Sequence, residues 1–220
     1  MTMPELNDDH PINRLQAIEA SGWLKRNFGQ QIADAVRGTA YSVDHICGIA
    51  CQETAYVWLA HDKELSPQEI CAMCVLDGSG DFKPAENPRS AFPRNTAAFR
   101  TKYGDEFTDM LINEGNSARR IRGMGPVDWI YKGYGIFQYD LQFVEEDEDF
   151  FRLRLWHDFN ECLKRLMQEL SRSWKDHNNL FDAIKAYNGS GKRAQIYAQN
   201  VTAYSSFAQE GDISGRVLPA

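Results

Sequence analysis

Residues 46–58, ICGIACQETAYVW, constrain the fold of this chain more than any other stretch. At the 3.6-residue period of an α-helix, Ile46, Ile49 and Val57 fall on one stripe, and the neighbouring stripe with Cys51 is also apolar. A helix that is apolar on most of its circumference is buried among other elements. The stretch therefore predicts a central, buried helix.

Glu53 lies on the same apolar stripe. Glutamate is almost never fully buried without a partner, because removing its charge from water is costly. Two interpretations follow: Glu53 has a cationic or hydrogen-bonding partner, such as an Arg or Lys, or it stays partly protonated at neutral pH. The second is the property that a general acid needs.

The rest of the chain is typical of helices joined by irregular segments. Ser66, Pro67 and Glu69 form a capping box with a proline start, and Ser42 or Asp44 can cap the central helix. Strict alternation of apolar and polar residues is almost absent, so we predict a mainly α chain with any small sheet confined to the loops. The helices are expected over 13–36 with an interruption at 21–22, and over 43–61, 66–75, 95–103, 105–118, 150–174, 180–187 and 192–207, with long irregular stretches at 77–94 and 123–135.

Charge and hydropathy exclude several classes of protein. A formal net charge of -7 disfavours nucleic acid as a partner, because phosphate binding needs clustered Lys and Arg. No apolar run approaches the roughly 20 residues that span a bilayer, so no membrane span is expected. The N-terminus, MTMPELNDDH, lacks the basic and then apolar pattern of a signal peptide. We expect a chain made in the cytoplasm that does not use the Sec route.

Five cysteines lie at positions 47, 51, 71, 74 and 162. The C-x3-C and C-x2-C spacings invite a zinc site, but both pairs lie on expected helices, where those spacings put small side chains on one face. We interpret them as buried core thiols, with a metal site or a disulfide between the two helices as alternatives. No metal and no cofactor is expected.

Three short segments occur in a suggestive order: Glu53-Thr54, then GYGIFQYD at 133–140, then AYNG at 186–189. Together they resemble the goose-type lysozyme and soluble lytic transglycosylase group, glycoside hydrolase family 23. In that family a helix ends in glutamate followed by Ser or Thr, and G-x-G-L-M-Q and A-Y-N-x-G segments follow. The resemblance covers about half of the chain and leaves out roughly 65 residues between 61 and 127, where the family has a shorter link.

The resemblance implies an α+β lysozyme-like fold. We accordingly expect a catalytic domain at 41–210 with an insertion at about 62–127, preceded by a helical extension at 1–40, which the resemblance does not cover, and followed by a tail at 211–220. The implied activity is cleavage of the β-1,4 bond between N-acetylmuramic acid and N-acetylglucosamine in peptidoglycan, with Glu53 as general acid. Such an acid must be protonated beside the leaving oxygen, and burial raises the pKa of a carboxyl accordingly.

The second carboxylate decides the reaction. Goose-type lysozymes have Q-x-D after the glycine segment and a further aspartate shortly before it, which Asp140 and Asp128 match. Lytic transglycosylases generally lack both and use the acetamido group of the substrate. Two such aspartates favour hydrolysis, with a helix cap at Asp140 and an ordinary loop position for Asp128 as the alternatives. Hydrolysis with inversion requires the base about 6.5 to 9.5 Å from the acid.

The resemblance also implies a set of substrate-binding residues, in which amide and phenol groups contact an N-acetyl group or orient the acid. These are Gln138, Tyr134, Tyr187 and Asn188. A packed tyrosine and a helix-ending Asn-Gly turn are the alternatives for the last two.

The biological setting stays open between a phage endolysin and an antibacterial toxin delivered by a secretion machine, with an immunity protein as a candidate partner. Either would act on glycan strands in the periplasm or outside the cell. A chitinase or chitosanase with a related fold, a non-catalytic wall-binding protein on the same scaffold and a zinc-organised module are further alternatives.

Overall fold

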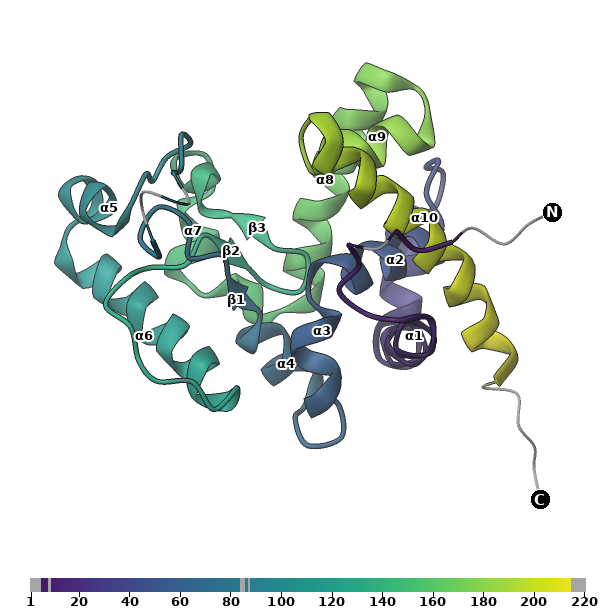
Figure 1. The fold of residues 1–220 in the computed structure, drawn as a ribbon, viewed down its shortest axis with the longest axis horizontal. Helices are drawn as coiled ribbons and strands as arrows, with labels where there is room; N and C mark the ends of the chain where they lie inside the picture. Colours follow the sequence, from purple (N-terminus) through teal and green to yellow (C-terminus); the bar gives the residue numbers. More distant parts are fainter. Residues whose placement is uncertain (1–4, 8, 84–85, 87, 215–220) are drawn as a thin grey trace. The chain divides into compact units, whose positions relative to one another are not determined.

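The computed structural model describes residues 5–7, 9–83, 86 and 88–214, with side chains described up to 210 (Figure 1). It is mostly helical with one small sheet, which confirms the predicted mainly α class. The chain divides into two compact units: unit 1 is Met1–Asp62 with Leu163–Ala220, and unit 2 is Lys63–Cys162. This division differs from the expected extension, catalytic domain and insertion.

Unit 1 is built around three helices that contact one another: α1 (Arg14–Val36), α2 (Val43–Glu53) and α10 (Gly191–Ser214). Both α1 and α2 begin at capping boxes, at Asn13 and Ser42. The caps hold the first backbone N–H groups of each helix, which have no partner inside the helix. The short helices α3 (Ala55–Trp58) and η1 (Leu59–His61), the helix α9 (Leu180–Tyr187) and most of α8 (Phe159–His177) complete the unit.

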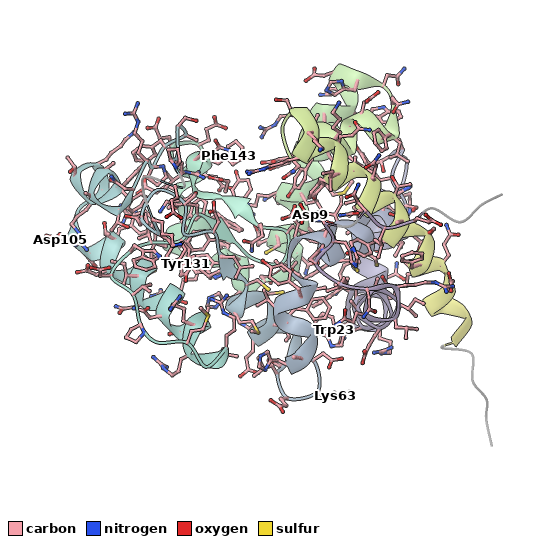
Figure 2. All side chains as sticks on the ribbon, viewed as in Figure 1. Asp9, Trp23, Lys63, Asp105, Tyr131 and Phe143 are labelled. Carbon is pink, nitrogen blue, oxygen red and sulfur yellow. The ribbon has the colours of Figure 1, made fainter. Side chains whose placement is uncertain are left out.

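Close contact between α2 and α10 depends on Gly48. A Cβ added there would lie 2.6 Å from the Ser205 hydroxyl and 2.8 Å from the Val201 carbonyl oxygen of α10. On the other side of α2, Ser21 and Cys51 lie 3.7 Å apart at the α1 contact, and Trp23 (Figure 2) packs on Trp58. The carboxyl end of α2 is therefore fixed between two helices.

Unit 2 contains a three-stranded antiparallel sheet in the order β1-β2-β3, and each strand has only two residues. Val75 pairs with Tyr134, and Gly133 pairs with Asp140. The elements in chain order are α4 (Pro67–Met73), β1 (Val75–Leu76), α5 (Thr96–Tyr103), α6 (Asp105–Ile121), β2 (Gly133–Tyr134), β3 (Tyr139–Asp140), η2 (Leu141–Glu145), α7 (Glu148–Arg152) and η3 (Leu155–His157).

The core of unit 2 is aromatic. Tyr134 has no exposed area, and its ring packs edge-on against Phe151 and Trp156 with centroids 5.3 and 4.8 Å away. Tyr139 stacks on Phe151 at 5.8 Å. These rings, rather than long strands, hold the small sheet together.

Several element boundaries differ from the expected ones. The helix α1 is continuous through 21–22, because Ser21 is buried against α2. The helix expected over 43–61 ends at Glu53, and the one expected over 150–174 is broken by Arg154, which adopts a left-handed φ of 55°. α10 continues to Ser214, and the remainder of the expected tail lies outside the described residues.

All five cysteines are reduced thiols with buried side chains, as the core interpretation predicts. Burial raises the pKa of the Cys51 thiol to about 12. In the described part of the chain, no helix is long and apolar enough to cross a membrane.

Candidate active site

Glu53 is the last residue of α2, where the helix gives way at Thr54. Thr54 is fully buried with φ -142°, and its hydroxyl accepts a hydrogen bond from Trp58 Nε1 at 3.1 Å. The side chain of Glu53 therefore projects from a helix end and is half-buried. The expected position inside a longer helix was wrong, because the break at Thr54 redirects the chain.

The partner of Glu53 is a tyrosine rather than a cation. Tyr197 of α10, itself buried, donates its hydroxyl to Glu53 Oε1 at 2.6 Å. Burial raises the pKa of Glu53 from 4.5 to about 7, and the hydrogen bond from Tyr197 opposes that rise. The helix dipole also disfavours negative charge at the carboxyl end of α2. Near neutral pH this carboxyl is thus available both as an acid and as its conjugate base.

The AYN segment lies beside this pair. The ring of Tyr187, at the end of α9, is 6.2 Å from the ring of Tyr197. Asn188 is the C-cap of α9, and it lines a pocket together with Glu53. The structure thus brings together two of the three segments that carry the family resemblance. The packed-tyrosine and helix-end interpretations also hold for these residues, and both are compatible with a place at a site.

The pocket that contains Glu53 has a volume of about 440 Å³. Gln52 and Tyr56 line it on the side of α2 and α3, and Arg193 and Ile196 line it on the side of α10. Tyr56 is 54% exposed, so an aromatic ring is open to a ligand next to the carboxyl. A volume in the range of about 300 to 1,000 Å³ is typical of small-ligand sites.

A third wall of the pocket comes from the N-terminal segment, through Asp9, His10 and Pro11. The first 40 residues were expected to be an extension outside the catalytic domain. The division stays a prediction, but part of this segment lines the same pocket as Glu53.

Gln138 and Tyr134 belong to unit 2. The Gln138 amide donates to the carbonyls of Cys74 at 3.0 Å and Gly135 at 2.8 Å, and its backbone adopts a φ of 55°. Gln138 therefore fixes the β2–β3 turn. Tyr134 was expected to contact substrate, but its side chain has no exposed area, so it is a core residue in this structure.

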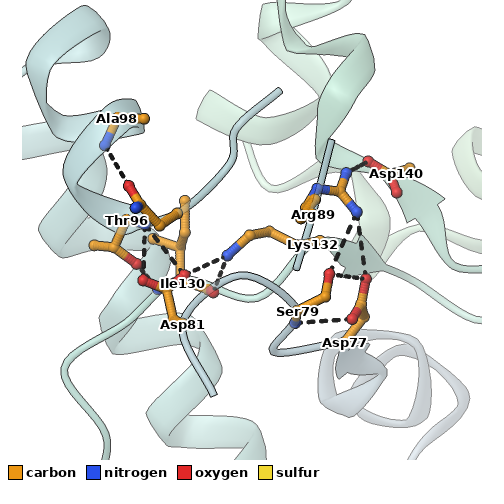
Figure 3. A network of polar contacts seen from close by, with 10 residues as sticks. Asp77, Ser79, Asp81, Arg89, Thr96, Ala98, Ile130, Lys132 and Asp140 are labelled. Atoms are coloured by element: carbon orange, nitrogen blue, oxygen red, sulfur yellow. Dashed lines mark hydrogen bonds and ion pairs between the residues drawn. The ribbon is translucent and has the colours of Figure 1, made fainter. Parts of the chain in front are cut away.

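Asp140 lies in a network of charged groups in unit 2 (Figure 3). Arg89 Nη2 donates to its carboxylate at 2.5 Å, and the same guanidinium also pairs with Asp77 at 3.5 Å. The Asp140 carboxylate accepts from the backbone N–H of Gln142 at 2.7 Å and so caps η2, which was the alternative interpretation of this residue. Burial raises the pKa of Asp140, and Arg89 opposes the rise.

The second centre of this network is Lys132, whose side chain has no exposed area. Its ammonium group contacts Asp81 at 2.7 Å and donates to the Ile130 carbonyl at 2.9 Å. Asp81 in turn accepts from the Thr96 backbone N–H at 2.9 Å. Burial lowers the pKa of Lys132, and Asp81 opposes that. These contacts fix Asp81, in the described part of the 77–94 segment.

Asp128 is exposed in the loop between α6 and β2. Asp128 and Asp140 belong to unit 2 and Glu53 to unit 1. The base role of either aspartate, and its distance from Glu53, stays a prediction.

The sequence reasoning missed Tyr197, Arg193 and the N-terminal wall. Tyr197 shares the buried face of α10 with Ala194, Ala198 and Val201, so its spacing is that of an ordinary core aromatic. The available signal was the expectation that a buried glutamate has a cationic or hydrogen-bonding partner, and it did not say which residue that would be.

In the described residues, no group of three or more His, Cys, Asp or Glu side chains is placed to hold a metal ion. No protein-family model matches this chain, and neither a curated protein nor a solved structure gives a significant match. The family resemblance therefore stays a prediction from the three segments.

Proposed function

We propose that this chain is a glycosidase that cleaves the β-1,4 bond between N-acetylmuramic acid and N-acetylglucosamine in peptidoglycan, with Glu53 as general acid. One observation carries the proposal: the half-buried carboxyl of Glu53, bonded to Tyr197, lines a pocket, and burial raises its pKa to about 7. A general acid works best when its pKa lies near the working pH. The nearby AYN segment supports the assignment to a glycan substrate.

The hydrogen bond from Tyr197 suggests where the proton resides. Because Tyr197 donates to Oε1, that oxygen acts as an acceptor, and the acidic proton of Glu53 is carried on Oε2. Oε2 then donates its proton to the glycosidic oxygen as the bond to the departing sugar breaks. The tyrosine hydroxyl stabilises the carboxylate that results. The leaving sugar departs as a neutral alcohol, and the sugar at the cleaved carbon passes through an oxocarbenium-like state.

Hydrolysis is the proposed outcome, with a water activated by Asp140 or Asp128. A second outcome, lytic transglycosylation, is favoured by a specific observation: Arg89 already neutralises Asp140 at 2.5 Å. The Oδ1 atom of Asp140 already accepts from both Arg89 and the Gln142 N–H, so it is less available to activate a water, and the acetamido group of the substrate can then take its place.

The test uses purified peptidoglycan and the variant Glu53→Gln. The variant should lose at least about 100- to 10,000-fold in cleavage rate, because an amide cannot deliver a proton. Glu69→Gln, which changes an exposed carboxyl of the α4 capping box, is the matched control and should cleave like the parent. Equal activity of Glu53→Gln and the parent would rule out this function, and binding without cleavage by the parent would favour the wall-binding alternative.

Mass spectrometry of the products separates the two outcomes. Reducing-end muropeptides indicate hydrolysis, and Asp140→Asn or Asp128→Asn should then slow the reaction. Anhydro-muropeptides with both variants fully active indicate a transglycosylase. In either case we propose that the enzyme reaches the cell wall after cell lysis or through a dedicated secretion route, where an immunity protein could accompany it.

A further inference from the structure

Residues 9–12, here called the N-terminal strap, run in an irregular, non-helical course alongside α10 (Figure 1). Two buried side chains of α10 hold the strap by its backbone. Asn200 Nδ2 donates to the Asp9 carbonyl at 2.8 Å, and Tyr204 Oη donates to the Ile12 carbonyl at 2.8 Å and accepts from the Ile12 N–H at 3.3 Å. Asn200 Oδ1 also accepts from the N–H of Asn7 at 3.0 Å.

The side chains of α10 thus form hydrogen bonds to the backbone of the strap, as the backbone of a paired strand would in a sheet. Asn200 has no exposed area, and it donates to the strap and accepts from the backbone of Asn7, which precedes the strap. Asn200 and Tyr204 are four residues apart and so lie on one face of the helix. The strap is thus fixed in register along α10, the helix that also carries Tyr197.

The held strap presents polar groups to the pocket of Glu53. Asp9 (Figure 2), His10 and Pro11 line the pocket, and His10 Nδ1 lies 2.6 Å from the Asn7 carbonyl. A carbonyl oxygen can only accept, so Nδ1 is the donor, and Nε2 of the neutral ring is an acceptor. That nitrogen can receive a hydrogen bond from a sugar hydroxyl.

The pocket lining is chemically suited to a glycan. It combines the exposed ring of Tyr56 with hydrogen-bonding groups on the strap. Aromatic rings pack against the apolar faces of sugars, and side chains with donors and acceptors match the hydroxyl and acetamido groups.

We propose that the N-terminal strap is a substrate-binding wall, that His10 contacts the glycan, and that Asn200 is the positioning residue that sets the wall. This inference rests on the proposed function and deepens it, because it assigns affinity for the glycan to a segment that the family resemblance does not cover. Proton transfer belongs to Glu53, so the strap controls KM and glycan affinity, and kcat does not depend on it.

The test compares His10→Ala and Asn200→Ala with Thr202→Ala. Thr202 lies on α10 and its hydroxyl bonds to the Ala198 carbonyl inside the helix, so it is the matched control. The probe is a β-1,4-linked tetramer of N-acetylglucosamine, with binding measured by calorimetry in the Glu53→Gln background. KM and kcat on peptidoglycan are measured with Glu53 intact.

Each strap variant should weaken tetramer binding about fivefold, as expected for one or two lost hydrogen bonds, and raise KM similarly. Its kcat and the pH dependence of kcat should stay those of the parent. His10 is exposed, so His10→Ala carries the test even if Asn200→Ala fails to fold. Binding by His10→Ala equal to that of the Thr202→Ala control, or a fall in kcat at unchanged KM, overturns the inference. If the parent neither binds nor cleaves glycan, the proposed function itself fails, and this result is distinct from failure of the strap variants alone.

Discussion

Replacing Glu53 with glutamine should make the protein more stable, and the gain should depend on pH. In the folded chain the pKa of this carboxyl is about 7, compared with 4.5 for a free glutamate. Below pH 4.5 the folded and unfolded states are both protonated, so the carboxyl has no effect on stability. Above pH 7 the unfolded state is ionised freely while the folded state ionises against burial, which lowers the free energy of unfolding.

The magnitude follows from the two pKa values. The difference between 4.5 and about 7 corresponds to about 3 kcal/mol. The glutamine of the variant keeps the shape of the side chain and an oxygen that accepts from Tyr197, but it has no charge to bury. The stability of the variant minus that of the parent should therefore grow by about 3 kcal/mol between pH 4 and pH 8.

Urea unfolding of the parent and the variant, followed by circular dichroism at pH 4, 5.5, 7 and 8, measures this difference. Hydrogen exchange of the α2 and α10 amides shows whether this difference in stability arises in unit 1. Glu69→Gln is a control in which the effect on stability should have the opposite sign. Hydrogen bonds from the Ser66 hydroxyl and N–H lower the pKa of Glu69, whereas burial raises that of Glu53. The free energy of unfolding of Glu69→Gln should therefore fall below that of the parent as the pH rises. A Glu53→Gln difference that is the same at all four pH values would refute the argument from burial.

Three further predictions concern the scaffold and the acid. Gly48→Ala should lower the free energy of unfolding by about 2 kcal/mol in urea titration through contact with α10, whereas Gly29→Ala, with its nearest neighbour at 4.0 Å, should be neutral or stabilising; equal effects would contradict this. Tyr197→Phe should raise the pKa of Glu53 and move the alkaline limb of the kcat–pH profile upward; a downward move would count against the hydrogen bond as its cause. Lys132→Met should destabilise by about 3 kcal/mol in the same titration, because it leaves Asp81 without its buried cation; a loss below about 1 kcal/mol would show that the pair is dispensable.

Helix starts were predictable from local chemistry. Ser42 and the Ser66–Glu69 capping box lie at the helix starts that the sequence indicates, because a cap depends on residues three positions apart. Helix ends were less predictable. The break after Glu53 depends on the burial of Thr54 and its contact with Trp58, which periodicity alone does not reveal.

The candidate site was predictable only in part. The apolar stripe singled out Glu53, and the AYN motif singled out Tyr187 and Asn188. The partner Tyr197 lies 144 residues away from Glu53, and the strap is held by side chains of α10 more than 190 residues further along. Contacts between residues so far apart in the sequence depend on how the helices pack, and local sequence patterns do not reveal that packing.

The split of unit 1 into two chain segments has a consequence for biosynthesis. Unit 2 is one continuous segment, so all of its residues have been synthesised before α10 is made. Domains fold as units during synthesis, and contacts between distant residues form slowly. During synthesis, α1 and α2 can pack against α10 only after α10 has been translated. The Glu53 pocket is therefore completed only after that point, because Arg193, Ile196 and Tyr197 of α10 form part of its lining.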